Sequence, residues 1–235
     1  MTDYSYEGKD LVEHFGYAKN WKKYFSKKIK PFIRGDVLEI GCADGASTEY
    51  LWKDSVSSWT CMDPDANLVR KLKQKYEDSF SKKIKTKIGM ITNLTENDKY
   101  DTILYLDVLE HILKDRQELC NALKHLNHGG KLIILSPAHQ VLFTPFDQHV
   151  GHYRRYNKKE LVNLIDEEVR LLKAFYIDSV GMIASIGNRF FLNASIPSIK
   201  QIMIWDKFMI PLSRLFDPVF NFRLGKSILV VWEKM

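Results

Sequence analysis

A short glycine-containing segment carries the clearest chemical signal in the sequence. Residues 37–45, Val-Leu-Glu-Ile-Gly-Cys-Ala-Asp-Gly, end an apolar stretch with an acid and two glycines that lie four positions apart. Glycine at the end of a buried strand lets the chain turn sharply and lets a ligand approach the backbone, because no Cβ intervenes. We therefore predict a strand, a loop and a helix, with a ligand bound where the helix starts.

The spacing of the glycines limits the kind of ligand. A dinucleotide fingerprint would need glycines at positions 43 and 46, and both positions are alanine. An acid at Glu39, just before the first glycine, instead favours a ligand that carries positive charge. S-adenosylmethionine is such a ligand.

A second acid supports a nucleoside-containing ligand. Residues 57–62 form another apolar stretch, which ends at Asp63, about 20 residues after the glycine loop. A carboxylate at this position accepts hydrogen bonds from both ribose hydroxyls. It would serve NAD or S-adenosylmethionine equally well, so it does not discriminate between them.

Titratable side chains gather between residues 136 and 157, where no periodicity is visible. A segment of this length inside a compact domain is usually functional or mobile. Histidine is the side chain whose charge changes near neutral pH, so His149 and His152 are candidates for a base that deprotonates an acceptor hydroxyl. Arginines here could clamp a phosphate or carboxylate, or one could brace the loop by pairing with an acid. The candidates for substrate binding are His139, Asp147, Tyr153, Arg154 and Arg155.

Two further candidates lie in residues 100–111. His111 is a third possible base, and its alternative role is helix capping and packing. Asp107 could orient an acceptor or a cofactor amino group, or it could start a helix. Asp107 and Glu110 could also assist a Mg²⁺-dependent transfer, but no spacing supplies further oxygen ligands, and we expect no metal.

The elements that must position these residues alternate along the chain. Strands separated by helices imply parallel crossovers, with ligand sites at the carboxyl ends of the strands. Asp63, Met90, Asp107 and Pro137 fall at those ends. We predict strands at 36–41, 57–62, 84–89, 100–106 and 131–136. We predict helices at 9–30, 65–79 and 114–126, and one more helix that follows the first strand and ends at about residue 53.

The last third is less regular. Strands are predicted at 171–178 and 226–232, with an apolar, aromatic insertion between them. Charged residues interrupt the insertion before it reaches the length of a membrane span, so amphipathic helices are expected. They could form a lid over an apolar substrate, contact a membrane surface, or pack in the core or in a dimer.

Several runs resemble the class I S-adenosylmethionine-dependent methyltransferases. Residues 100–111, which end in Leu-Asp-Val-Leu-Glu-His, are similar to the family's fourth-strand motif, and residues 129–135 are similar to its turn into strand five. The run Asp-Gln-His-Val-Gly-His-Tyr-Arg-Arg-Tyr, residues 147–156, resembles members whose genes accompany glycosyltransferases. The resemblance covers roughly residues 35–177.

This resemblance implies an α/β, Rossmann-like fold. Its sheet would have seven mostly parallel strands, helices on both faces, an antiparallel last strand and a helical insertion before that strand. Glu39 would support the glycine loop, Asp63 would bind ribose, and the chain near Met90 would contact adenine. The cofactor-binding residues implied are Glu39, Gly41, Cys42, Ala43, Gly45, Asp63, Pro64, Met90, Ile91, Leu106 and Asp107.

Composition agrees with a single domain over residues 1–235. We divide it into a helical cap (1–34), a cofactor-binding core (35–178), the insertion (179–225) and a closing strand (226–235). The polar, acidic N-terminus lacks the pattern of an export signal, and three cysteines without metal spacing are expected to be buried thiols, so we expect a cytoplasmic protein.

The predicted function is transfer of a methyl group from S-adenosylmethionine to a small molecule or glycan, with a sugar or lipid-linked saccharide hydroxyl as the favoured acceptor. The alternatives are a non-catalytic binding protein of the same fold and a methyltransferase that acts on RNA. Nucleic acid is the less favoured partner, because the net charge of +6 is explained by lysines on solvated helix faces. The oligomeric state is left open.

Overall fold

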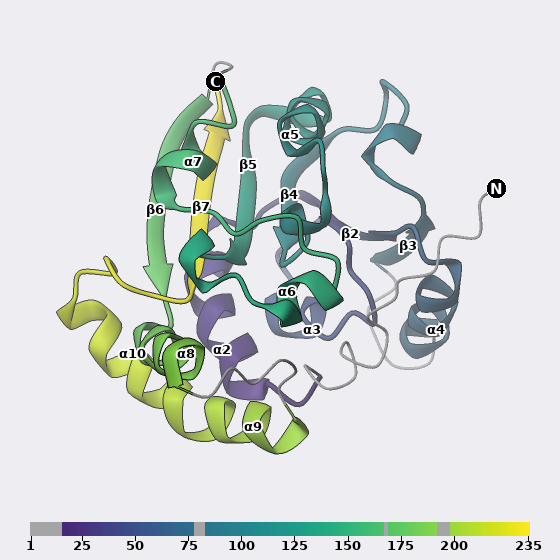
Figure 1. Cartoon of the computed structure of the whole chain (residues 1–235). Coiled ribbons are helices and arrows are strands. Elements are labelled where there is room, and N and C mark those ends of the chain that lie inside the picture. Colours follow the sequence, from purple (N-terminus) through teal and green to yellow (C-terminus); the bar gives the residue numbers. More distant parts are fainter. Residues whose placement is uncertain (1–15, 78–82, 167–168, 192–197) are drawn as a thin grey trace.

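A seven-stranded sheet lies at the centre of the computed structural model, which describes residues 16–77, 83–166, 169–191 and 198–235 (Figure 1). Its order is β3-β2-β1-β4-β5-β7-β6. The first five strands run parallel, and β7 is antiparallel to both neighbours, which confirms the predicted sheet. The strands are β1 (Asp36–Ile40), β2 (Ser58–Asp63), β3 (Ile84–Ile88), β4 (Tyr100–Leu106), β5 (Leu126–Pro137), β6 (Val169–Ile177) and β7 (Ser227–Lys234).

Helices and short helical turns connect the strands. The α-helices are α2 (Lys19–Ile29), α3 (Thr48–Leu51), α4 (Ala66–Glu77), α5 (Asp115–Lys124), α6 (Pro145–His149), α7 (Lys158–Val162), α8 (Ser179–Phe191), α9 (Ile199–Ile204) and α10 (Ile210–Val219). The 3-10 turns are η1 (Lys30–Phe32), η2 (Ile91–Asn93), η3 (Leu109–His111) and η4 (Gln140–Leu142), and η5 (Trp205–Met209) is a π-helix that joins α9 to α10.

The central strands of the sheet are buried on both faces, which explains their continuous apolar runs. In β5, Ile133 and Leu135 pack on the face that α2 and α4 cover, whereas Leu132 and Ile134 pack on the face that α5 and α7 cover. Successive side chains of a strand point to opposite faces, so one run of apolar residues supplies both cores.

Buried acids of the insertion attach it to the rest of the molecule. Asp206 on η5 accepts hydrogen bonds from the backbone N–H groups of Asn20 (3.0 Å) and Trp21 (2.8 Å), and so caps the start of α2. The rings of Trp21 and Trp205 lie 5.7 Å apart. In Figure 1 the helices of the insertion, α8, α9 and α10, lie against α2, beyond the lower ends of β6 and β7.

A second acid, Asp217 on α10, joins three elements. Its carboxylate accepts hydrogen bonds from the Tyr24 hydroxyl (2.7 Å) and from the backbone N–H groups of Asp178 (2.8 Å) and Ser179 (2.9 Å). The last two donors lie at the start of α8, where a carboxylate also interacts favourably with the helix dipole. Asp217 is fully buried, so its negative charge depends on these partners.

Some local predictions differ from the structure. The segment predicted to lack periodicity, 136–157, contains η4 and α6; α6 is short and starts at a capping box formed by Thr144 and Asp147, a signal too local for periodicity to detect. The helix predicted at 9–30 begins as α2 at Lys19, and residues 9–15 lie outside the described residues. Cys120 is half-buried rather than buried, because it lies at the edge of the face that α5 packs on the sheet.

Asp217→Ala is expected to lower the free energy of unfolding by about 3 kcal/mol, because three buried donors lose a charged acceptor. Urea denaturation followed by circular dichroism measures the change. Asp54→Ala, in an exposed turn, is the control and should change stability by less than about 0.5 kcal/mol. Equal effects of the two substitutions would contradict the role given to Asp217.

Candidate active site

A cavity of about 630 Å³ opens at the edge of the sheet where β1, β2, β4 and β5 end. The segments that follow these strands form much of its wall, and α2 and the insertion helices complete it. Its size suits a cofactor with a small acceptor beside it, because ligand cavities usually measure about 300–1,000 Å³. The predicted residues that line it are Glu39, Gly41, Cys42, Ala43, Asp63, Pro64, Leu106, Asp107, His111, Asp147, His152 and Arg155.

The glycine loop is held in a conformation that few side chains would permit. Gly41 has φ +67°, and a Cβ there would lie 2.4 Å from Val108 Cγ2. Ala43 also has a positive φ, of 48°, which costs a non-glycine residue about 1 kcal/mol or more. Its N–H donates to Asp63 Oδ2 at 3.0 Å, so the acid at the tip of β2 fixes the loop after β1.

Asp63 retains capacity to bind a ligand. Its other carboxylate oxygen accepts from the Asp65 N–H at 2.9 Å, and each oxygen has a second lone pair. Burial raises the pKa of Asp63 above its ordinary value, although these two backbone donors oppose the increase. A buried carboxylate that lines the cavity with unused acceptor positions fits the ribose hydroxyls of S-adenosylmethionine.

Glu39 supports the loop from beneath. Its Oε2 accepts from the Thr48 hydroxyl (2.6 Å) and from Trp59 Nε1 (2.9 Å), which joins β1 to α3 and β2. Burial raises the pKa of Glu39 to about 7, because these two hydrogen bonds do not replace the hydration that the charged form loses.

Asp107 follows β4 and has φ +53°, an uncommon value for a residue other than glycine. Its side chain is exposed to the cavity. Desolvation by the surrounding walls raises its pKa to about 7, and the positive charges of Lys22 and Lys226 only partly oppose this shift. Asp107 therefore adds to the acidic lining of the cavity.

A buried carboxylate organises the loop after β5. Asp147 accepts two parallel hydrogen bonds from Arg155, Nε to Oδ1 at 2.8 Å and Nη2 to Oδ2 at 2.9 Å, and its Oδ1 lies 2.8 Å from His152 Nδ1. Burial alone would raise the pKa of Asp147, but the hydrogen bonds from His152 and Arg155 hold it well below its ordinary value. Of the two arginines, Arg155 is thus the one that braces the loop.

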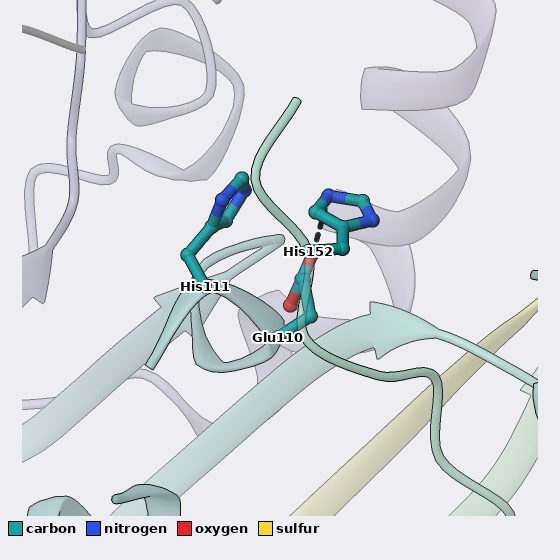
Figure 2. A group of neighbouring side chains, drawn as sticks. All are labelled: Glu110, His111 and His152. Carbon is teal, nitrogen blue, oxygen red and sulfur yellow. Dashed lines mark ion pairs between the residues drawn. The ribbon is translucent and has the colours of Figure 1, made fainter. Parts of the chain in front are cut away.

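This loop lies beside the segment that follows β4. The Tyr153 N–H donates to the Glu110 carbonyl at 2.8 Å, which places His152 next to Glu110 and His111. His152 Nε2 lies 3.8 Å from Glu110 Oε1, and the two imidazole rings lie 4.5 Å apart. Figure 2 shows the Glu110 carboxylate below the two rings, with the dashed line joining it to His152. We call these three side chains the Glu110–His111–His152 cluster.

Other predicted residues lie elsewhere and are not among the described residues that line the cavity. Arg154 donates to Asp115 Oδ2 at 2.6 Å and to the Leu113 carbonyl at 2.9 Å, so its guanidinium supports α5. The remainder are Gly45 in the loop, Met90 and Ile91 after β3, His139 against the Tyr176 ring, and the exposed His149 and Tyr153.

Sequence reasoning missed cavity residues that come from the cap, the insertion and the last strand. Lys22 on α2, Ser185 on α8, Trp205 on η5 and Lys226 before β7 all line the cavity. Lys226 Nζ lies 5.5 Å from the centre of the Trp205 ring. Three of these residues lie on helices with an ordinary amphipathic pattern, and Lys226 precedes a strand without any motif, so only the fold distinguishes them from core or surface residues.

Comparisons with known proteins agree with this geometry. A family model described as a methyltransferase domain matches residues 13–168. Over 101 residues, 42% of this chain, the sequence is 29% identical to a mitochondrial ubiquinone biosynthesis O-methyltransferase of Candida albicans, and the match spans 31% of that protein.

Solved structures share the fold at low sequence identity. The N-methyltransferase NodS of Bradyrhizobium japonicum WM9, in complex with S-adenosyl-l-homocysteine, superposes with a TM-score of 0.60 at 15% identity, over 92% of this chain and 87% of NodS. The [4+2]-cyclase SpnF superposes with a TM-score of 0.62 at 11% identity, over 92% of this chain and 80% of SpnF. At these identities the likeness establishes the fold alone.

Glu39→Gln is expected to change how stability depends on pH. The folded-state pKa of about 7 exceeds the ordinary 4.5, so the folded protein retains a proton that the unfolded chain loses, and the stability contributed by Glu39 falls as pH rises through this interval. Relative to the variant, the wild type should lose up to about 3 kcal/mol between pH 4.5 and 8. Urea unfolding at several pH values measures this difference.

The control is Glu96→Gln, at an exposed position. Its stability profile should run parallel to that of the wild type. A parallel profile for Glu39→Gln as well would show that Glu39 ionises normally in the folded protein.

Proposed function

This chain belongs to the methyltransferase-domain family, and we propose that it transfers a methyl group from S-adenosylmethionine to a hydroxyl of a small molecule or glycan. The observation that carries the proposal is a single cavity lined by both the Asp63 region and the Glu110–His111–His152 cluster. The cofactor site and the acceptor site must be adjacent if a methyl group is to be transferred directly from the cofactor to the acceptor.

The chain's residues fit S-adenosylmethionine, which when bound supplies an activated methyl group on a positively charged sulfur. Asp63 accepts hydrogen bonds from the ribose hydroxyls, and the backbone at Gly41 and Ala43 holds the amino-acid portion. Glu39 and Asp107 add acidic character that suits the positive charge. The adenine contacts proposed for Met90 and Ile91 remain a prediction.

The acceptor binds on the β4 and β5 side of the cavity. Because β1 lies between β2 and β4, Asp63 and the cluster are separated by two strand spacings, roughly 10 Å. Arg155 Nη1 is buried, lines the cavity and has no hydrogen-bond partner among the described residues, so it can donate to an acceptor oxygen. His111 and His152 lie beside the acceptor on this side of the cavity, whereas the exposed His149 is not among the described residues that line it.

A hydroxyl acceptor is supported by the relative named as an O-methyltransferase, and a saccharide by the similarity of residues 147–156 to methyltransferases associated with glycosyltransferases. The fold does not by itself specify methylation, because SpnF, which shares it, is named as a cyclase. A non-catalytic binding protein and an RNA methyltransferase are the competing functions.

Calorimetric titration with S-adenosylhomocysteine should show micromolar binding. Asp63→Ala should weaken it by at least ~50-fold, because a buried acceptor for two hydroxyls is lost. Asp54→Ala is the matched control and should bind as the wild type does. Absence of binding to the wild type would refute the proposed function, whereas binding without transfer of labelled methyl to saccharide, lipid or RNA extracts would favour the binding protein.

The exposed side chains on the outer face of the insertion support a proposal about the location of the acceptor. Side chains of α9, η5 and α10 form an exposed apolar stripe, with Phe208 57%, Leu215 65% and Val219 69% exposed. Lys200, Lys207 and Arg214 recur every seven residues and are exposed as well, which places them along one side of this helical segment. Both acids between residues 199 and 219, Asp206 and Asp217, are buried.

An apolar stripe flanked only by positive charge fits the surface of an anionic membrane. None of the described helices has the length and apolar character needed to cross a bilayer, so the contact would be with its surface. We propose that the insertion docks on such a membrane and gives the cavity access to a lipid-linked acceptor.

Phe208→Ser combined with Leu215→Ser should reduce co-sedimentation with phosphatidylglycerol-containing vesicles by roughly tenfold, because both side chains lose apolar contact with the lipid. Leu113→Ser, at a position 60% exposed in another part of the molecule, is the control and should leave binding unchanged. Equal binding to phosphatidylcholine vesicles would refute the preference for an anionic membrane, and self-association that the double substitution abolishes would make a second copy of the chain the partner.

A further inference from the structure

We propose that the Glu110–His111–His152 cluster binds one divalent transition-metal ion beside the acceptor. The binding is argued from the geometry of the cluster alone, whereas the chemical role given to the ion rests on the proposed function.

The three side chains converge from two segments. Glu110 and His111 lie on η3 after β4, and His152 lies on the loop after α6. One potential ligand atom of each lies within 4.8 Å of the other two, and the rings stand at 80° to one another (Figure 2). Ligand atoms around one tetrahedral ion, with bonds of about 2.0–2.1 Å, lie roughly 3.4 Å apart, so a closure of up to about 1.5 Å would complete the site.

An unsatisfied oxygen points to a missing cation. The Glu110 side chain is fully buried; its Oε2 accepts from the Ser136 hydroxyl at 2.9 Å, and its Oε1 has no hydrogen-bond partner among the described residues. A buried carboxylate oxygen without a partner destabilises the folded protein, because the hydration it loses is not replaced. A positive ion between Glu110 and the two imidazoles would satisfy it.

The second ring nitrogen of His152 is already held. His152 Nδ1 lies 2.8 Å from Asp147 Oδ1, and Arg155 keeps that carboxylate in place, so His152 Nε2 is the nitrogen that faces Glu110. Gly151 lies beside His111, because a Cβ built on Gly151 would be 3.8 Å from His111 Nδ1. A carboxylate or a carbonyl behind each ligating histidine is the usual arrangement at metal sites, where it fixes the tautomer and the orientation of the ring.

The ligand types select the ion. Two imidazoles and one carboxylate suit Mn²⁺, Fe²⁺, Co²⁺ or Zn²⁺, whereas Mg²⁺ and Ca²⁺ prefer oxygen ligands throughout. Three protein ligands leave coordination positions open toward the cavity. An acceptor hydroxyl bound there would have a lowered pKa and would release its proton to solvent, which makes its oxygen a better nucleophile.

The test uses tag-free, full-length protein that has been treated with a chelator and dialysed. Titration with Co²⁺ should give one saturable d–d absorption signal, and X-ray absorption of the complex should show histidine nitrogens. Glu110→Gln and His152→Gln should each weaken binding by at least ~10-fold. His128→Gln, which removes an exposed histidine from the start of β5, should bind Co²⁺ as the wild type does.

Titration with S-adenosylhomocysteine provides the second measurement. Variants that still bind it are folded, so their loss of Co²⁺ binding supports the site. Absence of saturable Co²⁺ binding, binding that Glu110→Gln leaves unchanged, or a complex without histidine ligands would overturn the proposal. If the protein binds Co²⁺ but not S-adenosylhomocysteine, the proposed metal site stands and the proposed function is wrong.

Discussion

Five strands of the sheet run parallel, and their carboxyl ends therefore meet at one edge, where the cavity opens. Each chain segment that leaves this edge must turn away from its strand at once. Ala43, Asp107 and His139 all have positive φ just after β1, β4 and β5, which is unfavourable for residues other than glycine. The paired strands stabilise these turns, and the turns direct backbone and carboxylate groups at the cavity.

The loop after β5 depends on Asp147. A fully buried carboxylate needs charged or hydrogen-bonding partners, and Arg155, His152 and Thr144 supply them. The hydrogen bonds to the Asp147 carboxylate therefore fix the positions of residues from both ends of the loop. The same interactions place His152 beside Glu110, so the stability of the loop and the chemistry of the cavity have one physical origin.

The insertion shows the same use of buried acids on a larger scale. Asp206 caps α2, Asp217 caps α8, and Asp178 accepts from Trp205 Nε1 and the Ser213 hydroxyl. Because Asp206 and Asp217 are buried, residues 199–219 expose no acid, and their exposed charged side chains are all basic. The packing that closes the cavity with Trp205 thereby also determines the charge of the surface that faces outward.

The sequence by itself determined the strand order along the chain, the glycine loop and the acids at the strand ends, because these depend on local periodicity and on the shape of glycine. It also singled out His111, His152 and Asp147, but it could not separate them from His149 or Arg154. Only the tertiary structure decided that Arg155 rather than Arg154 pairs with Asp147, that His149 is exposed, and that Lys22 and Lys226 reach the cavity. These facts depend on contacts between residues far apart in the chain, and no local pattern of residues encodes the distance between them.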